Sequence, residues 1–158
     1  MFNYEQIPVH CSFMIPWMIP QKDLSDGRRA DAVILCVDDD DVTLDVIKLT
    51  LEKNGFSVLT ATNWRRALDT FRKNPIDLVM LDYEMPEMKG HEVAVLIRSI
   101  DPTVPIILHS GSPQIPDCAI KMTDAFLQKG VETHILVDAI SNLIMNSQLN
   151  PIRAQRRA

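Results

Sequence analysis

Apolar residues in the middle of the chain follow two patterns that alternate along the sequence. Short, mainly apolar runs begin at residues 32, 56, 76, 104 and 124, and they read AVILCV, FSVLTA, IDLVMLD, VPIILHS and DAFLQ. Runs of this length and composition are typical of strands that are buried on both faces of a sheet. Between the runs, apolar residues recur every three or four positions, as they do on the buried face of a helix.

The segments between these runs carry signals for the ends of helices. They predict helices at 41–54, 63–74, 91–100 and 132–146. Gly55 is a typical residue at the end of a helix, Asn63 can cap the second helix, and Pro75 closes it. Residues 113–122 contain two prolines and predict a short helix at best.

Strands that alternate with helices indicate an α/β fold with a parallel sheet covered on both faces. The pattern predicts a single domain over residues 32–147. Residues 1–31 show neither a helical nor a strand period and are interpreted as a flexible N-terminal extension. One alternative is that translation begins downstream, at Met14 or Met18. Another is that the apolar stretch SFMIPWMI docks on the domain or on a partner. Residues 148–158 are predicted to be a basic C-terminal tail.

Composition narrows the class of protein. The net charge of −5 gives no overall electrostatic signature of nucleic-acid binding. Three cysteines without a CxxC pair argue against a disulfide framework or a zinc site and favour a reducing compartment. There is no signal-peptide pattern and no apolar run of transmembrane length, so we expect a cytoplasmic protein that does not enter a membrane.

Polar residues gather at the ends of four of the five predicted strands. Asp38 and Asp39 follow the first strand, Asp82 ends the third, Ser110 ends the fourth, and Lys129 follows the fifth. The carboxyl ends of parallel strands share one edge of the sheet, so these side chains should lie together. Each residue alone has an ordinary structural explanation, and it is their combination that indicates a site.

The first strand runs into four consecutive aspartates, Asp38 to Asp41, which repel one another. One of them, Asp41 or else Asp40, is assigned to capping the next helix. Clustered carboxylates suit Mg²⁺, and a carboxylate can also attack phosphorus to form an aspartyl phosphate. Asp38 and Asp39 are therefore interpreted as a Mg²⁺ site beside a phosphorylatable Asp82.

From VILCVDDD through LDYEMPEMKG and ILHSG to FLQKG, the chain resembles the receiver domain of two-component response regulators. The resemblance covers roughly residues 31–147 and implies a flavodoxin-like fold with five parallel strands in the order 2-1-3-4-5. It also implies a role for each site residue by position. The phosphoryl group would be accepted by Asp82 and contacted by Lys129 and Ser110. Mg²⁺ would be held by Asp82 together with Asp38, Asp39 and the backbone carbonyl of Glu84. The switch would be formed by Ser110 and Phe126.

Three positions qualify the resemblance. Gly130 stands where the family usually has a proline in a cis peptide, and a cis bond before glycine would cost about 3 kcal/mol, so the loop should take another path. The Glu84 side chain is interpreted as a solvated acid, with an influence on phosphate lifetime left open. His109 is expected to be a half-buried, hydrogen-bonded histidine rather than a metal ligand.

The leading hypothesis is a stand-alone receiver that takes its phosphoryl group from a histidine kinase or histidine phosphotransfer protein and acts through protein contact. Such a module catalyses only its own phosphorylation and dephosphorylation, and we expect it not to bind DNA directly. Alternatives are a Mg²⁺-dependent phosphohydrolase with an aspartate nucleophile, although DxDxT is missing, and a receiver-like scaffold that is never phosphorylated. A flavin-binding protein is disfavoured because four acids would repel the FMN phosphate.

Overall fold

The computed structural model describes residues 32–112 and 114–149, so the predicted extension at 1–31 and most of the predicted tail at 148–158 lie outside the described residues. Strands and helices alternate along the described chain. The strands are β1 (Val33–Val37), β2 (Ser57–Ala61), β3 (Leu78–Asp82), β4 (Ile106–Ser110) and β5 (Ala125–Gln128). The helices are α1 (Asp41–Lys53), α2 (Trp64–Lys73), α3 (Gly90–Ile100), α4 (Asp117–Ile120) and α5 (Thr133–Gln148).

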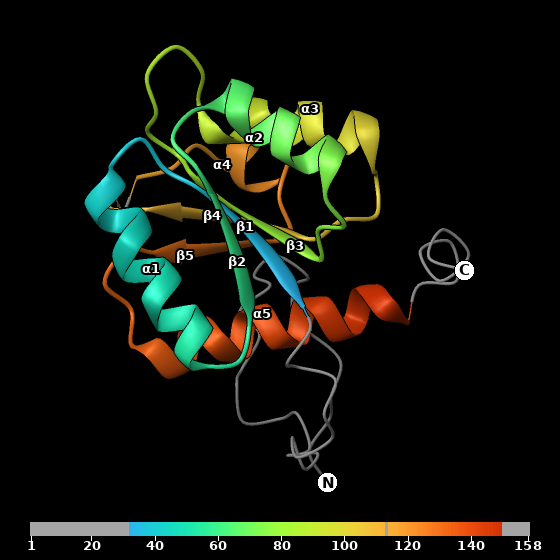
Figure 1. The fold of residues 1–158 in the computed structure, drawn as a ribbon. Helices are drawn as coiled ribbons and strands as arrows, with labels where there is room; N and C mark the ends of the chain where they lie inside the picture. Colours follow the sequence, from blue (N-terminus) through green and yellow to red (C-terminus); the bar gives the residue numbers. More distant parts are fainter. Residues whose placement is uncertain (1–31, 113, 150–158) are drawn as a thin grey trace, which may run out of the picture.

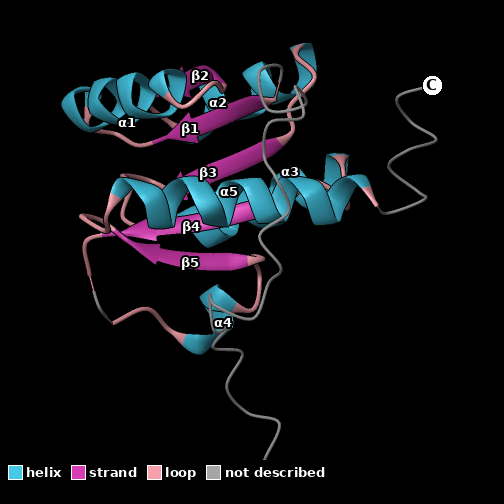
Figure 2. Cartoon of the chain, turned by 90° about the horizontal axis from the view of Figure 1, so that it is seen from below, coloured by secondary structure: helices cyan, strands magenta, loops and turns pink. Residues whose placement is uncertain are grey.

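The five strands form one parallel sheet in the order β2-β1-β3-β4-β5, which confirms the predicted flavodoxin-like fold (Figure 1). Helices α1 and α5 cover one face of the sheet, and α2, α3 and α4 cover the other. In Figure 2 the strands follow one another in this order, with α5 lying in front of β3 and β4. None of the helices in the described ranges is long and apolar enough to span a membrane.

Both faces of the sheet are apolar because each covers a separate core. Along β1, Leu35 and Val37 face the core under α2 and α3, whereas Ile34 and Cys36 face the core under α1 and α5. All four of these side chains are buried. Since both faces are covered, the strands read as continuous apolar runs and not as an alternation of apolar and polar residues.

The observed strands are shorter than the apolar runs that predicted them. Ile76 and Val104 belong to the runs but precede β3 and β4, and both are still buried. Burial, which sets the apolar pattern, therefore extends beyond the residues that pair in the sheet. Helix α5 continues to Gln148, two residues past its predicted end.

The cap of α1 corrects one assignment. The N-cap is Asp40, not Asp41, because the backbone of Asp40 is extended and its carboxylate accepts from the backbone N–H of Val42 at 3.1 Å. Asp41 is the first helical residue, where its charge suits the positive end of the helix. The two other signals are confirmed: Asn63 caps α2, and Gly55 follows α1 with a φ of +88°.

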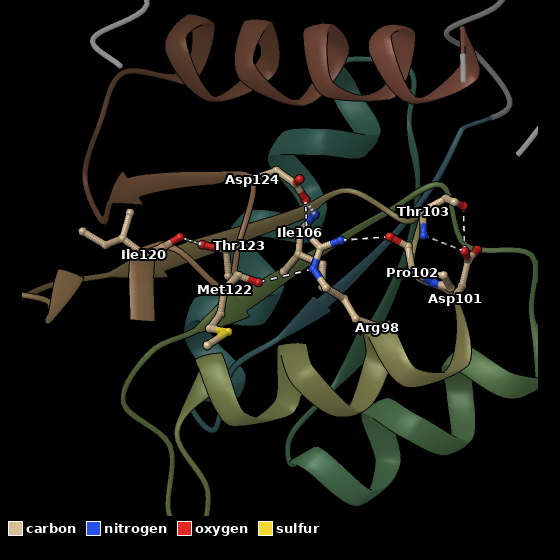
Figure 3. A network of polar contacts seen from close by, with 9 residues as sticks. All are labelled: Arg98, Asp101, Pro102, Thr103, Ile106, Ile120, Met122, Thr123 and Asp124. Atoms are coloured by element: carbon tan, nitrogen blue, oxygen red, sulfur yellow. Dashed lines mark hydrogen bonds and ion pairs between the residues drawn. The ribbon is translucent and has the colours of Figure 1, made fainter. Parts of the chain in front are cut away.

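Helix α4 has only four residues, as the ambiguous pattern at 113–122 suggested. Beyond its end, the chain is fixed by Arg98 at the end of α3 (Figure 3). The Arg98 guanidinium donates to the carbonyls of Met122 and Pro102 and pairs with Asp124 at 2.6 Å. The same Asp124 carboxylate accepts from the backbone N–H of Ile106 at 2.7 Å, so one network joins α3 to the starts of β4 and β5.

Candidate functional site

The structure brings three predicted acids together at the carboxyl edge of the sheet. Carboxylate oxygens of Asp38, Asp39 and Asp82 lie within 4.8 Å of one another. Asp38 follows β1 directly and Asp82 is the last residue of β3, and these two strands are neighbours in the sheet. We call these three carboxylates, with the ammonium of Lys129 described next, the acid pocket.

Lys129 lies between two of the acids. Its ammonium is 2.7 Å from a carboxylate oxygen of Asp38 and 3.2 Å from one of Asp82. Its backbone N–H donates to the carbonyl of Ser110 at 2.7 Å, which anchors the residue to the end of β4. Three carboxylates and one ammonium leave a formal charge of about −2, which a divalent cation would neutralise.

The two acids after β1 have different surroundings. Asp38 is buried, and one of its carboxylate oxygens accepts from the backbone N–H of Asp40 at 3.0 Å while the other pairs with Lys129. Asp39 is exposed to solvent. A buried acid and an exposed acid side by side form a site that is open to solution on one side.

The electrostatics of the pocket follow from this crowding. Burial, followed by the negative charge of Asp38, raises the pKa of Asp82, although Lys129 and the backbone N–H of Glu84 act in the opposite direction. Burial alone would lower the pKa of the Lys129 ammonium, but its hydrogen bonds and charge interactions with Asp38 and Asp82 outweigh burial and raise this pKa. The pocket therefore holds more negative charge than its own lysine compensates.

The predicted switch residues lie beside the pocket without joining it. Ser110 is fully buried at the end of β4, and its hydroxyl oxygen accepts from the backbone N–H of Ser112 at 3.1 Å. Among the described residues, no hydrogen bond joins this hydroxyl to Asp82. Phe126 is half-buried on β5 and packs against the core under α2 and α3.

The loop after Asp82 contains a constraint that the sequence pattern did not single out. A Cβ atom on Gly90 would lie 2.1 Å from the carbonyl oxygen of Asp82, so no larger residue fits without moving that backbone. The Gly90 N–H also donates to the carbonyl of Tyr83 at 3.0 Å. The side chain of Glu84 is exposed, as expected of a solvated acid. The start of α3 thus packs directly on the backbone of the acid pocket.

The same loop is tied to α2 by Glu87, a residue that sequence reasoning missed. Glu87 has a φ of +67°, and its carboxylate accepts from the Trp64 indole N–H at 3.3 Å and pairs with Arg65. Arg65 also stacks its guanidinium 4.4 Å from the centre of the Trp64 ring. No spacing signal could have paired these residues, which are more than twenty positions apart.

The loop after β5 takes a path that suits glycine. Gly130 has a φ of +91° and follows Lys129 in a turn closed by the N–H of Val131 and the carbonyl of Gln128 at 3.4 Å. A positive φ at the third position of a turn is the requirement of a type II turn. The described residues contain no cis peptide bond, as expected for this sequence.

Two further titratable groups in the central strands are held neutral. His109 is more deeply buried than expected, at 6% exposed, and burial is the main cause that lowers its pKa to about 4. Burial also raises the pKa of the Cys36 thiol to about 12, with a smaller contribution from Asp38, so this thiol is inert.

The donor set of the pocket fits a hard divalent cation. Asp38, Asp39 and Asp82 present carboxylate oxygens only, and Mg²⁺ is commonly held by one or two carboxylates together with water and phosphate oxygens. No nitrogen or sulfur ligand takes part in this cluster, which disfavours zinc. The carboxylate of Asp82 is also the nucleophile that an aspartyl phosphate would require.

Comparison with known proteins agrees with this geometry. The sequence profile of the response regulator receiver domain matches residues 34–141. The chain is 33% identical over 120 residues to the transcriptional regulatory protein GlrR of Escherichia coli (strain K12); this alignment covers 73% of the chain but only 27% of GlrR, so the chain spans about a quarter of that relative.

Solved structures show the same fold. A response regulator receiver domain protein from Clostridium thermocellum has a TM-score of 0.70 and 32% identity, and the match covers 75% of this chain and 98% of that one. The response regulator TrrA from Thermotoga maritima, solved in complex with Mg(2+)-BeF, has a TM-score of 0.68 and 32% identity over 71% of this chain and 98% of that one. The chain therefore belongs to the response regulator receiver domain family.

Proposed function

We propose that the chain is a stand-alone phosphorylation switch. Asp82 accepts a phosphoryl group from a histidine kinase or a histidine phosphotransfer protein, and the phosphorylated chain signals through contact with another protein. The observation that carries this proposal is the acid pocket itself: a carboxylate of raised pKa between two further acids and a lysine, at the open edge of a parallel sheet. Membership of the receiver family supports it.

The proposed reaction transfers one phosphoryl group and nothing else. A carboxylate oxygen of ionised Asp82 attacks the phosphorus atom and forms a new P–O bond. The bond from phosphorus to the donor breaks, and its electron pair leaves with the histidine nitrogen or, for a small donor, with the acetate oxygen. Lys129, 3.2 Å from Asp82, is placed to stabilise the negative charge on the phosphoryl oxygens.

Mg²⁺ is the cofactor that the pocket would hold. Asp38, Asp39 and Asp82 would be its carboxylate ligands, and the backbone carbonyl of Glu84 would add another. The ion would supply positive charge to the phosphoryl oxygens. The Mg(2+)-BeF complex of TrrA, a relative at 32% identity, supports this assignment.

Phosphorylation would act through Ser110 and Phe126. The buried Ser110 hydroxyl would turn from the N–H of Ser112 toward the phosphoryl group, and Phe126 would turn inward with it. In this way the phosphoryl group biases an equilibrium between two conformations. On this proposal the chain acts in the cytoplasm, turns over no external substrate and does not bind DNA directly.

The test is intact mass after incubation with acetyl phosphate and Mg²⁺. We expect one added phosphoryl group in the wild type, and none in Asp82→Asn or without Mg²⁺. Asp45→Asn is the matched control, because Asp45 is an exposed aspartate of α1 outside the acid pocket. An unmodified wild type that still binds Mg²⁺ would favour a scaffold instead. Rapid consumption of acetyl phosphate and other phosphoesters without an adduct would favour a phosphohydrolase.

A further inference from the structure

One residue of the loop between β3 and α3 has a left-handed backbone although it is not a glycine. Glu87 has a φ of +67°, and among residues 32–112 and 114–149 it is the only non-glycine residue with a positive φ. A residue that carries a Cβ adopts this conformation at a cost, and it stays there only where the surrounding structure holds it. Contacts of Glu87 must therefore fix the loop in this shape.

Two adjacent side chains at the start of α2 hold the Glu87 carboxylate. It pairs with the Arg65 guanidinium and accepts a hydrogen bond from the Trp64 indole N–H at 3.3 Å. The guanidinium also lies 4.4 Å from the centre of the Trp64 ring, so the two donors support each other. The hydrogen bonds from Arg65 and Trp64 lower the pKa of Glu87, which keeps its carboxylate ionised. We call these three side chains the Glu87 cluster.

The start of α2 is a firm support for this contact. Trp64 and Arg65 are the first two residues of the helix, and Asn63 caps it by accepting from the N–H of Arg66 at 3.0 Å. The Trp64 ring packs against the core under α2 and α3. The Glu87 carboxylate is therefore tied to a fixed point outside its own loop.

The loop that Glu87 holds also supplies groups to the acid pocket. Three positions before Glu87, the backbone N–H of Glu84 donates to the carboxylate of Asp82. The carbonyl of Glu84 is the ligand that the loop would offer to a cation under the proposed function. The backbone of Glu84 must therefore keep one orientation if both groups are to serve the pocket.

Main-chain hydrogen bonds anchor the two ends of this loop. The N–H of Tyr83 donates to the carbonyl of His109 at 3.1 Å, and the N–H of Gly90 donates to the carbonyl of Tyr83 at 3.0 Å. Between these anchors, Glu87 connects the loop to α2. Because Glu84 lies between Tyr83 and Glu87, these two residues together constrain the path of its backbone.

We propose that Glu87 is a positioning residue for the cation site. Held by Trp64 and Arg65, it keeps the loop in the shape that directs the backbone of Glu84 at the acid pocket. The affinity for Mg²⁺ thus depends on an ion pair that lies outside the acid pocket. This inference rests on the proposed binding of Mg²⁺.

Isothermal titration calorimetry with MgCl₂ tests the proposal on the unphosphorylated full chain. Glu87→Asn removes both contacts and introduces a residue that tolerates a positive φ, so the variant does not strain the backbone. We expect the Kd for Mg²⁺ to rise about fivefold or more in Glu87→Asn and in Arg65→Ala, as for a coupling between two sites. Glu87→Gln should raise it less, because its amide oxygen can still accept from the indole.

The two substitutions change the local charge in opposite directions, which separates positioning from electrostatics. Loss of the Arg65 charge alone would strengthen cation binding, and loss of the Glu87 charge alone would weaken it. Positioning predicts weaker binding in both, with no further loss in the double variant, because each removes the same contact. Arg66→Ala, at an exposed neighbour on α2, is the matched control and should not weaken binding. The proposal is overturned if Arg65→Ala binds Mg²⁺ as tightly as the wild type or more tightly.

Urea unfolding in Mg²⁺-free buffer separates positioning from a general loss of stability. The Arg65 and Glu87 side chains are 64% and 60% exposed, so their pair should contribute little to the unfolding free energy. We expect the urea midpoints of Arg65→Ala and Glu87→Asn to stay close to that of the wild type while the Kd rises. Variants that are already partly unfolded without urea would assign the weaker binding to unfolding and overturn the proposal.

Hydrogen exchange without Mg²⁺ separates a failure of this proposal from a failure of the proposed cofactor. The amide protons of Glu84 and Met85 should exchange several-fold faster in Glu87→Asn and Arg65→Ala than in the wild type or Arg66→Ala. If the wild type binds no Mg²⁺, the proposed cofactor is wrong, and faster exchange would still support the hold of Glu87 on the loop. Unchanged exchange in a chain that binds Mg²⁺ would overturn the positioning role and leave the proposed function intact.

Discussion

At the scale of single residues, His109 shows how the central strands restrict their polar side chains. It pairs with Asp82 in the register of β3 and β4, and it is 6% exposed. Burial disfavours the imidazolium form, and nearby Lys129 adds to this effect, so the pKa falls to about 4. The imidazole is therefore neutral in the folded protein over the range in which an unfolded histidine gains its proton.

This buried imidazole predicts a pH dependence of stability. Below its unfolded pKa of 6.5, the unfolded chain binds a proton that the folded chain does not, so the unfolding free energy falls as the pH falls toward 4. Between pH 6.5 and about pH 5 the expected loss from this group is about 2 kcal/mol. Urea unfolding of the wild type and His109→Asn over this range measures it, and equal slopes in the two proteins would contradict it.

Removal of the Lys129 ammonium should destabilise the protein, and this effect should be largest near neutral pH. Lys129→Met leaves Asp38 and Asp82 buried without their ammonium partner. Because the lysine side chain is 27% exposed, we expect a loss of about 2 kcal/mol in the unfolding free energy at neutral pH, less than for a fully buried pair.

Removal of Lys129 should also raise the pKa of Asp82 further. An acid whose folded pKa lies above its unfolded value destabilises the fold as the pH rises, so the deficit of the variant should shrink as the pH falls from neutral toward the carboxylate range. Chemical unfolding in Mg²⁺-free buffer at two pH values measures this change. A deficit that is the same at both would show that the ammonium is not compensating the two acids.

At the scale of elements, the site depends on how closely α3 approaches the end of β3. Gly90, the first residue of α3, lies against the carbonyl of Asp82, and a Cβ there would also lie 3.1 Å from a side-chain carbon of Leu108. The colliding atom nearest to this Cβ is backbone, which cannot rotate away as a flexible side chain would. The position of α3 and the position of Asp82 are therefore linked.

Gly90→Ala should consequently destabilise the protein. Alanine is the better helix former by about 1 kcal/mol, but the 2.1 Å approach to the Asp82 carbonyl should outweigh this gain and leave a net loss of about 2 kcal/mol or more. Gly111→Ala is the matched control, since a Cβ at Gly111 meets nothing within 4 Å. Thermal unfolding of both variants decides the matter, and comparable stabilities would argue against the contact.

At the scale of the whole molecule, negative charge is concentrated at one edge of the sheet. The chain carries a net charge of −5, and the acid pocket with Asp40 and Asp41 contributes much of it. A cation bound only by the folded state stabilises that state by mass action. Cation binding in the acid pocket should therefore raise the unfolding free energy of the whole domain.

Mg²⁺ is expected to raise the melting temperature of the wild type. At a free concentration of about ten times Kd, the added unfolding free energy is about 1.4 kcal/mol. Asp39→Asn should remove most of this increase with little loss of basal stability, because the Asp39 side chain is exposed. Differential scanning calorimetry with Mg²⁺ and with an equal ionic strength of NaCl separates binding from screening. Equal shifts in the two salts would argue against a specific site.

The sequence by itself determined the architecture and the edge at which the site lies. Burial on both faces makes strands apolar throughout, and parallel strands all end at one edge, so the polar residues after the runs had to meet there. Local signals such as the Asn63 cap and the end of α1 at Gly55 were also readable, because they involve residues within a few positions of one another.

Only the tertiary structure decided contacts between distant parts of the chain. They include three ion pairs, Lys129 with Asp38, Arg65 with Glu87, and Arg98 with Asp124. They also include the close approach of Gly90 to the backbone of Asp82. Each depends on how packed elements are placed relative to one another to within about an ångström, which no periodicity of hydrophobic residues encodes. Even the choice of Asp40 over Asp41 as the cap was decided by the extended backbone of Asp40 and its hydrogen bond from the N–H of Val42, because the sequence offers four consecutive aspartates before the helix.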